Sequence, residues 1–208
     1  MCQRALEGRE KALGRDHTST LSTEKALGRD HTSTLSTVNN LGALYKYQGR
    51  LTEAESMYQR ALEGKEKALG WDHISTLSTV NNLSALYADQ GRLTEAESMY
   101  QRALEGKEKA LGRDHTSTLS TVNDLGALYA NQGRLTEAES MHQRALSGFQ
   151  TALGPSHWKS QLVMRNMDSL QHAKGIPKTR FVGYDRAAAA QSPRKNLGEI
   201  TSQISRVP

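Results

Sequence analysis

The sequence predicts an all-α fold, a right-handed solenoid of about three stacked helix pairs with degenerate ends. The chain repeats itself every 42 residues, and each repeat contains two stretches with the 3.6-residue apolar period of amphipathic helices. Only 36% of the residues are apolar and 5% are aromatic. This is low for a compact core but suits a solenoid, in which each helix buries a single stripe.

The repeat is visible both at single positions and over long segments. The 23-residue segment QGRLTEAESMYQRALEGKEKALG occurs at 48–70 and again, letter for letter, at 90–112. We therefore expect three full repeats, at 31–70, 71–112 and 113–154, followed by a capping helix at 155–174. Four glycines mark the 42-residue spacing: Gly28, Gly70, Gly112 and Gly154.

Each repeat carries the signals for two helices and two turns. In the first repeat the apolar period predicts helices over roughly 33–47 and 51–69, with Gly49 and Gly70 marking the turns that follow them. Thr52 and Glu55 have the spacing of a capping box at the start of the second helix. Gly64 and its copies lie inside the second helices, where each is expected to cost about 0.8–1 kcal/mol relative to Ala.

The two ends of the chain depart from the repeat. Residues 1–30 are interpreted as a truncated, degenerate repeat, because the segment EKALGRDHTSTLST at 10–23 recurs unchanged at 24–37. Residues 175–208 are interpreted as a disordered basic tail. Residues 174–208 contain seven basic and two acidic residues, so 1–173 carry no net charge. The pI near 9.3 therefore does not predict a nucleic-acid partner.

Composition and motifs disfavour several classes of protein. Cys2 is the single cysteine, which rules out an internal disulfide. No apolar run approaches the roughly 18 residues of a membrane span, and no signal peptide is recognisable, so we expect a cytoplasmic location. Phosphate-loop, zinc-protease and nucleophile-elbow motifs are also missing, so we expect neither enzymatic activity nor a cofactor.

An Asp-His pair recurs with the repeat and admits two interpretations. Copies one unit apart are too distant to share a metal ion, whose ligands lie about 2.0–2.2 Å away. Helix-start chemistry is therefore favoured over metal binding. The pairs are Asp16-His17, Asp30-His31, Asp72-His73 and Asp114-His115.

The small and aromatic residues of one unit resemble the signature of the tetratricopeptide repeat. In the first unit they are Leu41, Gly42, Tyr45, Ala54, Tyr58 and Ala61. Their copies keep the pattern except at Ser84 and His142. The 42-residue length, the LG-x-DH linker and the NNL triplets resemble the repeats of kinesin light chains. The resemblance implies protein binding rather than catalysis.

In tetratricopeptide geometry the first helices line a concave groove. The resemblance therefore implies that Asn39, Asn81 and Asn123 lie there, where carboxamides can pair with the backbone of an extended peptide. The alternative is that these residues are ordinary solvent-exposed polar residues of the helices. Lys46 is the one basic residue on that face, which disfavours a clamp for an acidic tail. Three further residues flank the asparagines: Asn40, Asn82 and Asp124.

Three hypotheses of function remain open. The favoured one is a non-catalytic adaptor that binds an extended segment of a partner protein. The second is a sensor array belonging to a nucleotide-binding signalling receptor, and the third is a product of unequal recombination without a selected role. The resemblance also brings in the kinesin heavy chain as a partner. However, light chains bind it through a heptad coiled coil, and residues 1–30 contain no heptad array.

Overall fold

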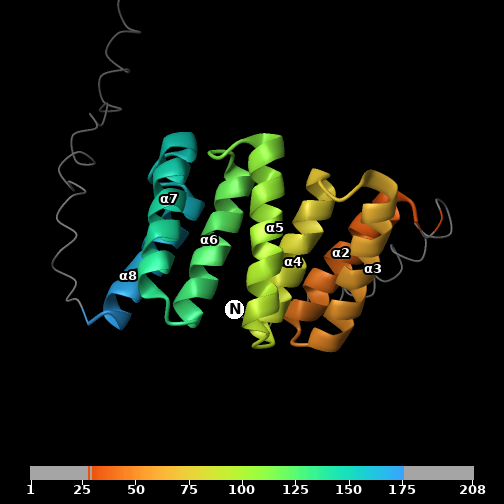
Figure 1. Cartoon of the computed structure of the whole chain (residues 1–208), viewed down its shortest axis with the longest axis horizontal. Coiled ribbons are helices and arrows are strands. Elements are labelled where there is room, and N and C mark those ends of the chain that lie inside the picture. Colours follow the sequence, from red (N-terminus) through yellow and green to blue (C-terminus); the bar gives the residue numbers. More distant parts are fainter. Residues whose placement is uncertain (1–27, 29, 176–208) are drawn as a thin grey trace, which may run out of the picture. The chain divides into compact units, whose positions relative to one another are not determined.

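The computed structural model of the chain describes residue 28 and residues 30–175, and this part contains seven helices (Figure 1). The helices are α2 (Thr32–Tyr47), α3 (Leu51–Leu69), α4 (Ile74–Asp89), α5 (Leu93–Leu111), α6 (Thr116–Asn131), α7 (Leu135–Leu153) and α8 (Trp158–Ala173). The predictions for 1–27 and for 176–208 lie outside the described residues. Of the described residues, those up to Leu170 belong to one compact unit and residues 171–175 to another.

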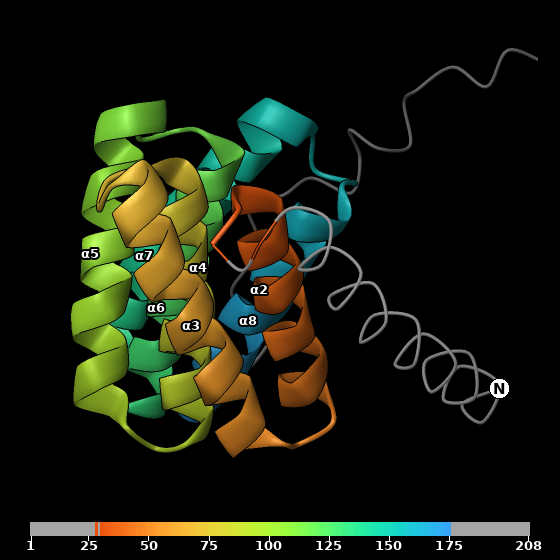
Figure 2. The same cartoon turned by 90° about the vertical axis from the view of Figure 1, so that its right-hand side faces the viewer.

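The all-α repeat fold is confirmed, and the apolar period located the two helices of the first repeat to within a residue. The helices expected over 33–47 and 51–69 are α2 and α3, and the helix expected within 155–174 is α8. Each first helix packs against the second helix of its own repeat, and α3 and α5 also pack against the first helix of the next repeat. In Figure 2 the second helices α3, α5 and α7 lie on one side and the first helices α2 and α8 on the other.

The recurring histidine begins each first helix. His115 is the residue before α6, and its Nδ1 accepts a hydrogen bond of 3.1 Å from the backbone N–H of Ser117. His31, His73 and His157 accept the same bond from the residue two positions later. The threonine hydroxyl of Thr118 donates to the carbonyl of Gly112, at 2.9 Å, and so ties the new helix to the end of the previous one. Helix-start chemistry therefore accounts for His31, His73 and His115 of the Asp-His pairs, whereas Asp16-His17 lies outside the described residues.

The predicted capping box is wrong. Helix α3 begins after Arg50 without a side-chain capping bond. Glu55 faces the next repeat instead, where its carboxylate accepts from Gln90 at 2.9 Å and from Arg92 at 2.8 Å. Glu55 thus makes a contact between repeats rather than a helix cap.

The expectation for the glycines inside the second helices also needs correction. A Cβ atom on Gly106 would lie 2.6 Å from a methyl group of Leu77, which is 1% exposed. Gly64 and Gly148 meet Leu35 and Leu119 in the same way. The missing side chain lets the two helices of a repeat approach each other, so glycine stabilises the packing at these positions although it weakens the isolated helix.

The chain shows no membrane-spanning candidate within the described residues, since none of these helices is both long and apolar enough to cross a bilayer.

We predict that Gly106→Ala destabilises the protein. The helix-propensity gain of about 1 kcal/mol is outweighed by overpacking of about 1–3 kcal/mol against the buried Leu77. Urea unfolding followed by circular dichroism measures the difference. Ser98→Ala, on the exposed side of the same helix, is the control and should not destabilise. Adding Leu77→Val should recover part of the loss, and a stabilised Gly106→Ala protein would contradict the packing argument.

Candidate protein-interaction face

The asparagines predicted to line the groove join consecutive first helices. Each carboxamide is hydrogen-bonded to the residue 43 positions away, that is, one repeat plus one residue. We call these three contacts the asparagine ladder. They are Asn82 Nδ2 to Asn39 Oδ1 at 3.2 Å, Asn81 Nδ2 to Asp124 Oδ2 at 3.1 Å, and Asn166 Nδ2 to Asn123 Oδ1 at 3.0 Å.

Further bonds tie two of these carboxamides into the fold. The Thr121 hydroxyl donates to Asn81 Oδ1 at 2.7 Å, and His142 Nδ1 lies 3.2 Å from Asn123 Oδ1. Asn123 is only 8% exposed, whereas Asn40 lies on the surface. The asparagines thus have a structural role that the sequence did not predict, and their contact with a partner stays a prediction.

Lys46 also takes part in the stacking of first helices. Its ammonium lies 3.1 Å from the carboxylate of Asp89, which is the last residue of α4. The predicted basic residue of the face is therefore ion-paired with the neighbouring repeat.

The second helices are joined by arginine–glutamate pairs in two rows. In the first row, Arg92 Nη1 lies 2.8 Å from Glu55 of the preceding repeat, and Arg134 Nη1 lies 2.7 Å from Glu97. The guanidinium of Arg92 also stacks on the ring of Tyr87, 3.8 Å from its centre.

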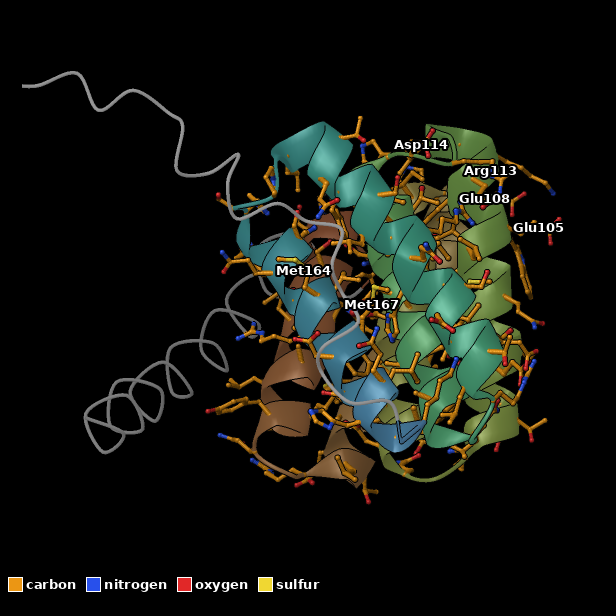
Figure 3. The ribbon with its side chains drawn as sticks, turned by 90° about the vertical axis from the view of Figure 1, so that its left-hand side faces the viewer. Glu105, Glu108, Arg113, Asp114, Met164 and Met167 are labelled. Atoms are coloured by element: carbon orange, nitrogen blue, oxygen red, sulfur yellow. The ribbon has the colours of Figure 1, made fainter. Side chains whose placement is uncertain are left out.

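The second row lies nearer the C-terminal ends of these helices. Arg102 pairs with Glu66 at 2.7 Å, and Arg144 pairs with Glu108 at 2.6 Å. Figure 3 shows Glu108 near the end of α5, beside Arg113 of the following turn. Both rows repeat the same contact at both junctions between second helices.

Two lysines are buried between a second helix and the next first helix. Lys65 and Lys107 are 3% and 4% exposed, and their ammonium groups donate to Thr79 and Thr121 at 2.9 and 2.8 Å. Burial lowers the pKa of both amines, and for Lys107 it lowers the pKa to about 8. Thr121 in turn donates to Asn81, so the amine is connected to the asparagine ladder.

Asp124 replaces the asparagine that stands at this position in the other repeats. Burial raises the pKa of its carboxyl group, while the bond from Asn81 and the charge of Lys107 act in the opposite direction. The Asp124 carboxylate is therefore a partly buried hydrogen-bond acceptor, and the donor of Asn81 holds it in place.

A pocket of about 270 Å³ lies between α6, α7 and α8, and its lining includes Asn123 and Asp124. The other lining residues are Ser120, Phe149, Trp158, Lys159, Leu162 and Val163. Helix α8 closes this region through Val163 and Met167, which are buried with residues of α6 and α7. Figure 3 labels Met167 on α8.

Trp158 and Lys159 were not predicted as site residues from the sequence. The sequence did contain a sign of their role, because these two residues break the repeat: the equivalent positions one unit earlier hold Thr116 and Ser117. Trp158 is 62% exposed, and Lys159 donates to the Ser120 hydroxyl at 3.1 Å.

A protein-family model described as tetratricopeptide repeat matches residues 33–109 and 75–151 of the chain. The two matches together cover more than half of the 208 residues. No curated protein matches the sequence.

Solved structures of similar fold include kinesin light chain-like repeat proteins. The putative kinesin light chain of Podosopora anserina, with nearly identical TPR-like repeats, has a TM-score of 0.64 and 20% identity over 96% of this chain and 90% of that chain. A second crystal structure under the same description, of a single-residue variant, has a TM-score of 0.65 and 21% identity, covering 80% and 79%. BtubC (BKLC) of P. vanneervenii has a TM-score of 0.61 and 19% identity, covering 88% and 78%. At these identities the likeness is one of fold.

We predict that Asn81→Ala lowers the free energy of unfolding by about 1–3 kcal/mol, because it leaves the buried Thr121 hydroxyl and the Asp124 carboxylate without their shared partner. Asn40→Ala, at an exposed position, should stay within about 0.5 kcal/mol of the parent. Urea titration of the three proteins measures both values, and equal losses would refute the structural role of the ladder.

We predict that Lys107 makes stability depend on alkaline pH. Its folded pKa of about 8 lies below the ordinary lysine value, so the unfolded chain binds the proton more tightly. Stability should rise with pH from about 8 towards 10.5 and stay level below that window. Relative to Lys107→Met, the parent should gain about 2 kcal/mol between pH 8 and pH 10. The exposed Lys67→Met is the control, and parallel pH profiles of parent and Lys107→Met would contradict the assignment.

Proposed function

Because the chain belongs to the tetratricopeptide repeat family, whose members are protein-interaction scaffolds, we propose that it is a non-catalytic adaptor. Its binding surface is the side formed by the first helices α2, α4, α6 and α8. There it holds an extended segment of a partner polypeptide. This surface is called the first-helix face below.

The observation that carries the proposal is the asparagine ladder. The three contacts place amide groups in a row, each at the same offset from the next. Adjacent first helices are therefore fixed relative to each other before any ligand arrives, so binding would require little ordering of the protein.

The first-helix face has both hydrogen-bonding capacity and room. A carboxamide offers two N–H donors and an oxygen with two lone pairs, and the ladder uses only part of this set. Asn40 is exposed and Asn82 is half-buried. The alanines one turn away, Ala43, Ala85 and Ala127, keep the side chains beside them short. An extended backbone, which alternates donors and acceptors, is a suitable partner for such a face.

The solved structures favour a kinesin light chain-like form of this role. Two of them are named as a putative kinesin light chain with nearly identical TPR-like repeats. In this chain the repeats would act in cargo-type peptide binding, which needs only the stacked helices of 31–174.

We predict that Ala43→Arg with Ala85→Arg weakens peptide binding at least about tenfold, because bulky charged side chains would fill the first-helix face. Peptides selected from a random phage-displayed library on the full chain provide the ligands, and fluorescence anisotropy measures their affinity. Ser56→Arg with Ser98→Arg adds the same charge at exposed positions of α3 and α5 and should leave the affinity unchanged. Equal weakening by both pairs, or by neither, would contradict the proposed face.

A further inference from the structure

The pocket between α6, α7 and α8 differs chemically from the equivalent places in the rest of the array. The eight positions that line it can be followed one and two repeats back along the sequence. The two earlier sets are identical at seven of these positions and differ only at Ile74 and Thr116. The set in the pocket keeps only Ser120 and Asn123 from the set before it.

Two of the replacements are coupled. In the earlier repeats a buried lysine donates to a threonine, as in the pair Lys107 and Thr121. In the pocket Phe149 and Val163 occupy these two positions. The amine and its hydroxyl acceptor have been lost together, so the base of the pocket is apolar without leaving a polar group unpaired.

A second amine reaches the pocket from α8. Lys159 donates to Ser120 at 3.1 Å, and its ammonium lies 5.4 Å from the ring centre of Phe149 and 5.7 Å from that of Trp158. An ammonium group has three donors, and the Ser120 hydroxyl takes one of them. Asp124, one helical turn after Ser120, supplies an acceptor in the same lining.

The lining therefore combines an apolar base with one carboxylate and one ammonium. A peptide group supplies an N–H for the carboxylate and a carbonyl for the ammonium. A charged side chain would be attracted by one of these groups and repelled by the other. An uncharged apolar side chain, in contrast, would gain from contact with Phe149 and Trp158.

We propose that this pocket is the anchor site of the first-helix face, and that it takes an uncharged apolar side chain of an extended partner segment whose adjoining peptide group lies between Asp124 and Lys159. The inference rests on the proposed function and adds to it the position and the chemistry of the anchor. Trp158 forms the exposed wall over the bound side chain.

The test restores the residues of the repeat. Trp158→Thr with Lys159→Ser gives the pocket the side chains found at Thr116 and Ser117. Phage-selected peptides should share an apolar uncharged residue, and their affinity should fall at least about tenfold for this double variant. Replacing that residue of the peptide by Asp or by Lys should weaken binding similarly. A peptide that keeps its affinity with Asp or Lys at the anchor would overturn the proposed chemistry.

The chain offers a matched control in its other tryptophan. Trp71 is 64% exposed, close to the 62% of Trp158, and it replaces the arginine found at Arg113. Trp71→Arg should leave peptide affinity unchanged. It also leaves Trp158 as the sole tryptophan of the chain, so the emission of this variant should shift to shorter wavelength on peptide binding. An unchanged emission would overturn the proposal even if the double variant failed to fold.

The outcomes separate the two proposals. Peptides whose binding is lost in Ala43→Arg with Ala85→Arg but unaffected in Trp158→Thr with Lys159→Ser would leave the adaptor role standing and refute the anchor. If the library yields no specific peptide, the adaptor role and the anchor are both refuted.

Discussion

The structure depends on the contact between one helix pair and the next. A single pair cannot bury its own apolar stripe, so each repeat is stable only when stacked on a neighbour. The polar side chains make the stacking geometry specific. Pairs of side chains 43 residues apart, two Asn–Asn and one Asn–Asp, join the first helices, and arginine–glutamate pairs join the second helices. Because equivalent positions of the repeat meet at successive junctions, one short sequence can build several similar interfaces.

These polar contacts mainly fix how neighbouring repeats are aligned and contribute less to stability. The ion pairs between second helices are partly exposed, with Arg92 and Glu55 at 36% and 22%, and such pairs are worth about 1 kcal/mol or less. The leucines and alanines between the helices supply most of the stabilisation, since Leu83 and Leu125 are each 2% exposed and burial of such a side chain is worth about 1.5–3 kcal/mol. Apolar surfaces tolerate sliding, whereas a hydrogen bond with a fixed partner does not. The ladder and the ion pairs therefore select one alignment among those that the apolar core would accept.

The sequence predicted which residues are helical but not which polar residues meet. Helix limits follow from local patterns, so the apolar period and Gly49 placed α2 and α3 almost to the residue. The partner of Glu55 lies in another repeat, and the capping-box spacing with Thr52 offered a nearer but incorrect explanation. The asparagines lie in first helices, as the apolar period predicted, but their bonding offset of 43 rather than 42 residues depends on how the helices cross. Likewise, the role of Gly64 depends on its contact with Leu35, which the local sequence pattern does not show.

A nearly uniform array leaves one problem for a ligand, which is where along the array to bind. An extended peptide displaced by one repeat along α2, α4 and α6 would meet almost the same side chains, so these helices alone favour no single position. Only a site whose side chains differ from those of the other repeats can favour one position of the peptide over the others. The exchange of Lys107 and Thr121 for Phe149 and Val163 is such a departure, because it replaces a buried amine and its hydroxyl acceptor by buried apolar side chains at one end of the first-helix face. In the proposed mode of binding, a side chain that fits there would fix the position of every residue bound before it, and the ladder would need to recognise only the backbone. In that mode, the one unusual junction would supply the specificity for a partner, and the several equivalent junctions would supply the general affinity.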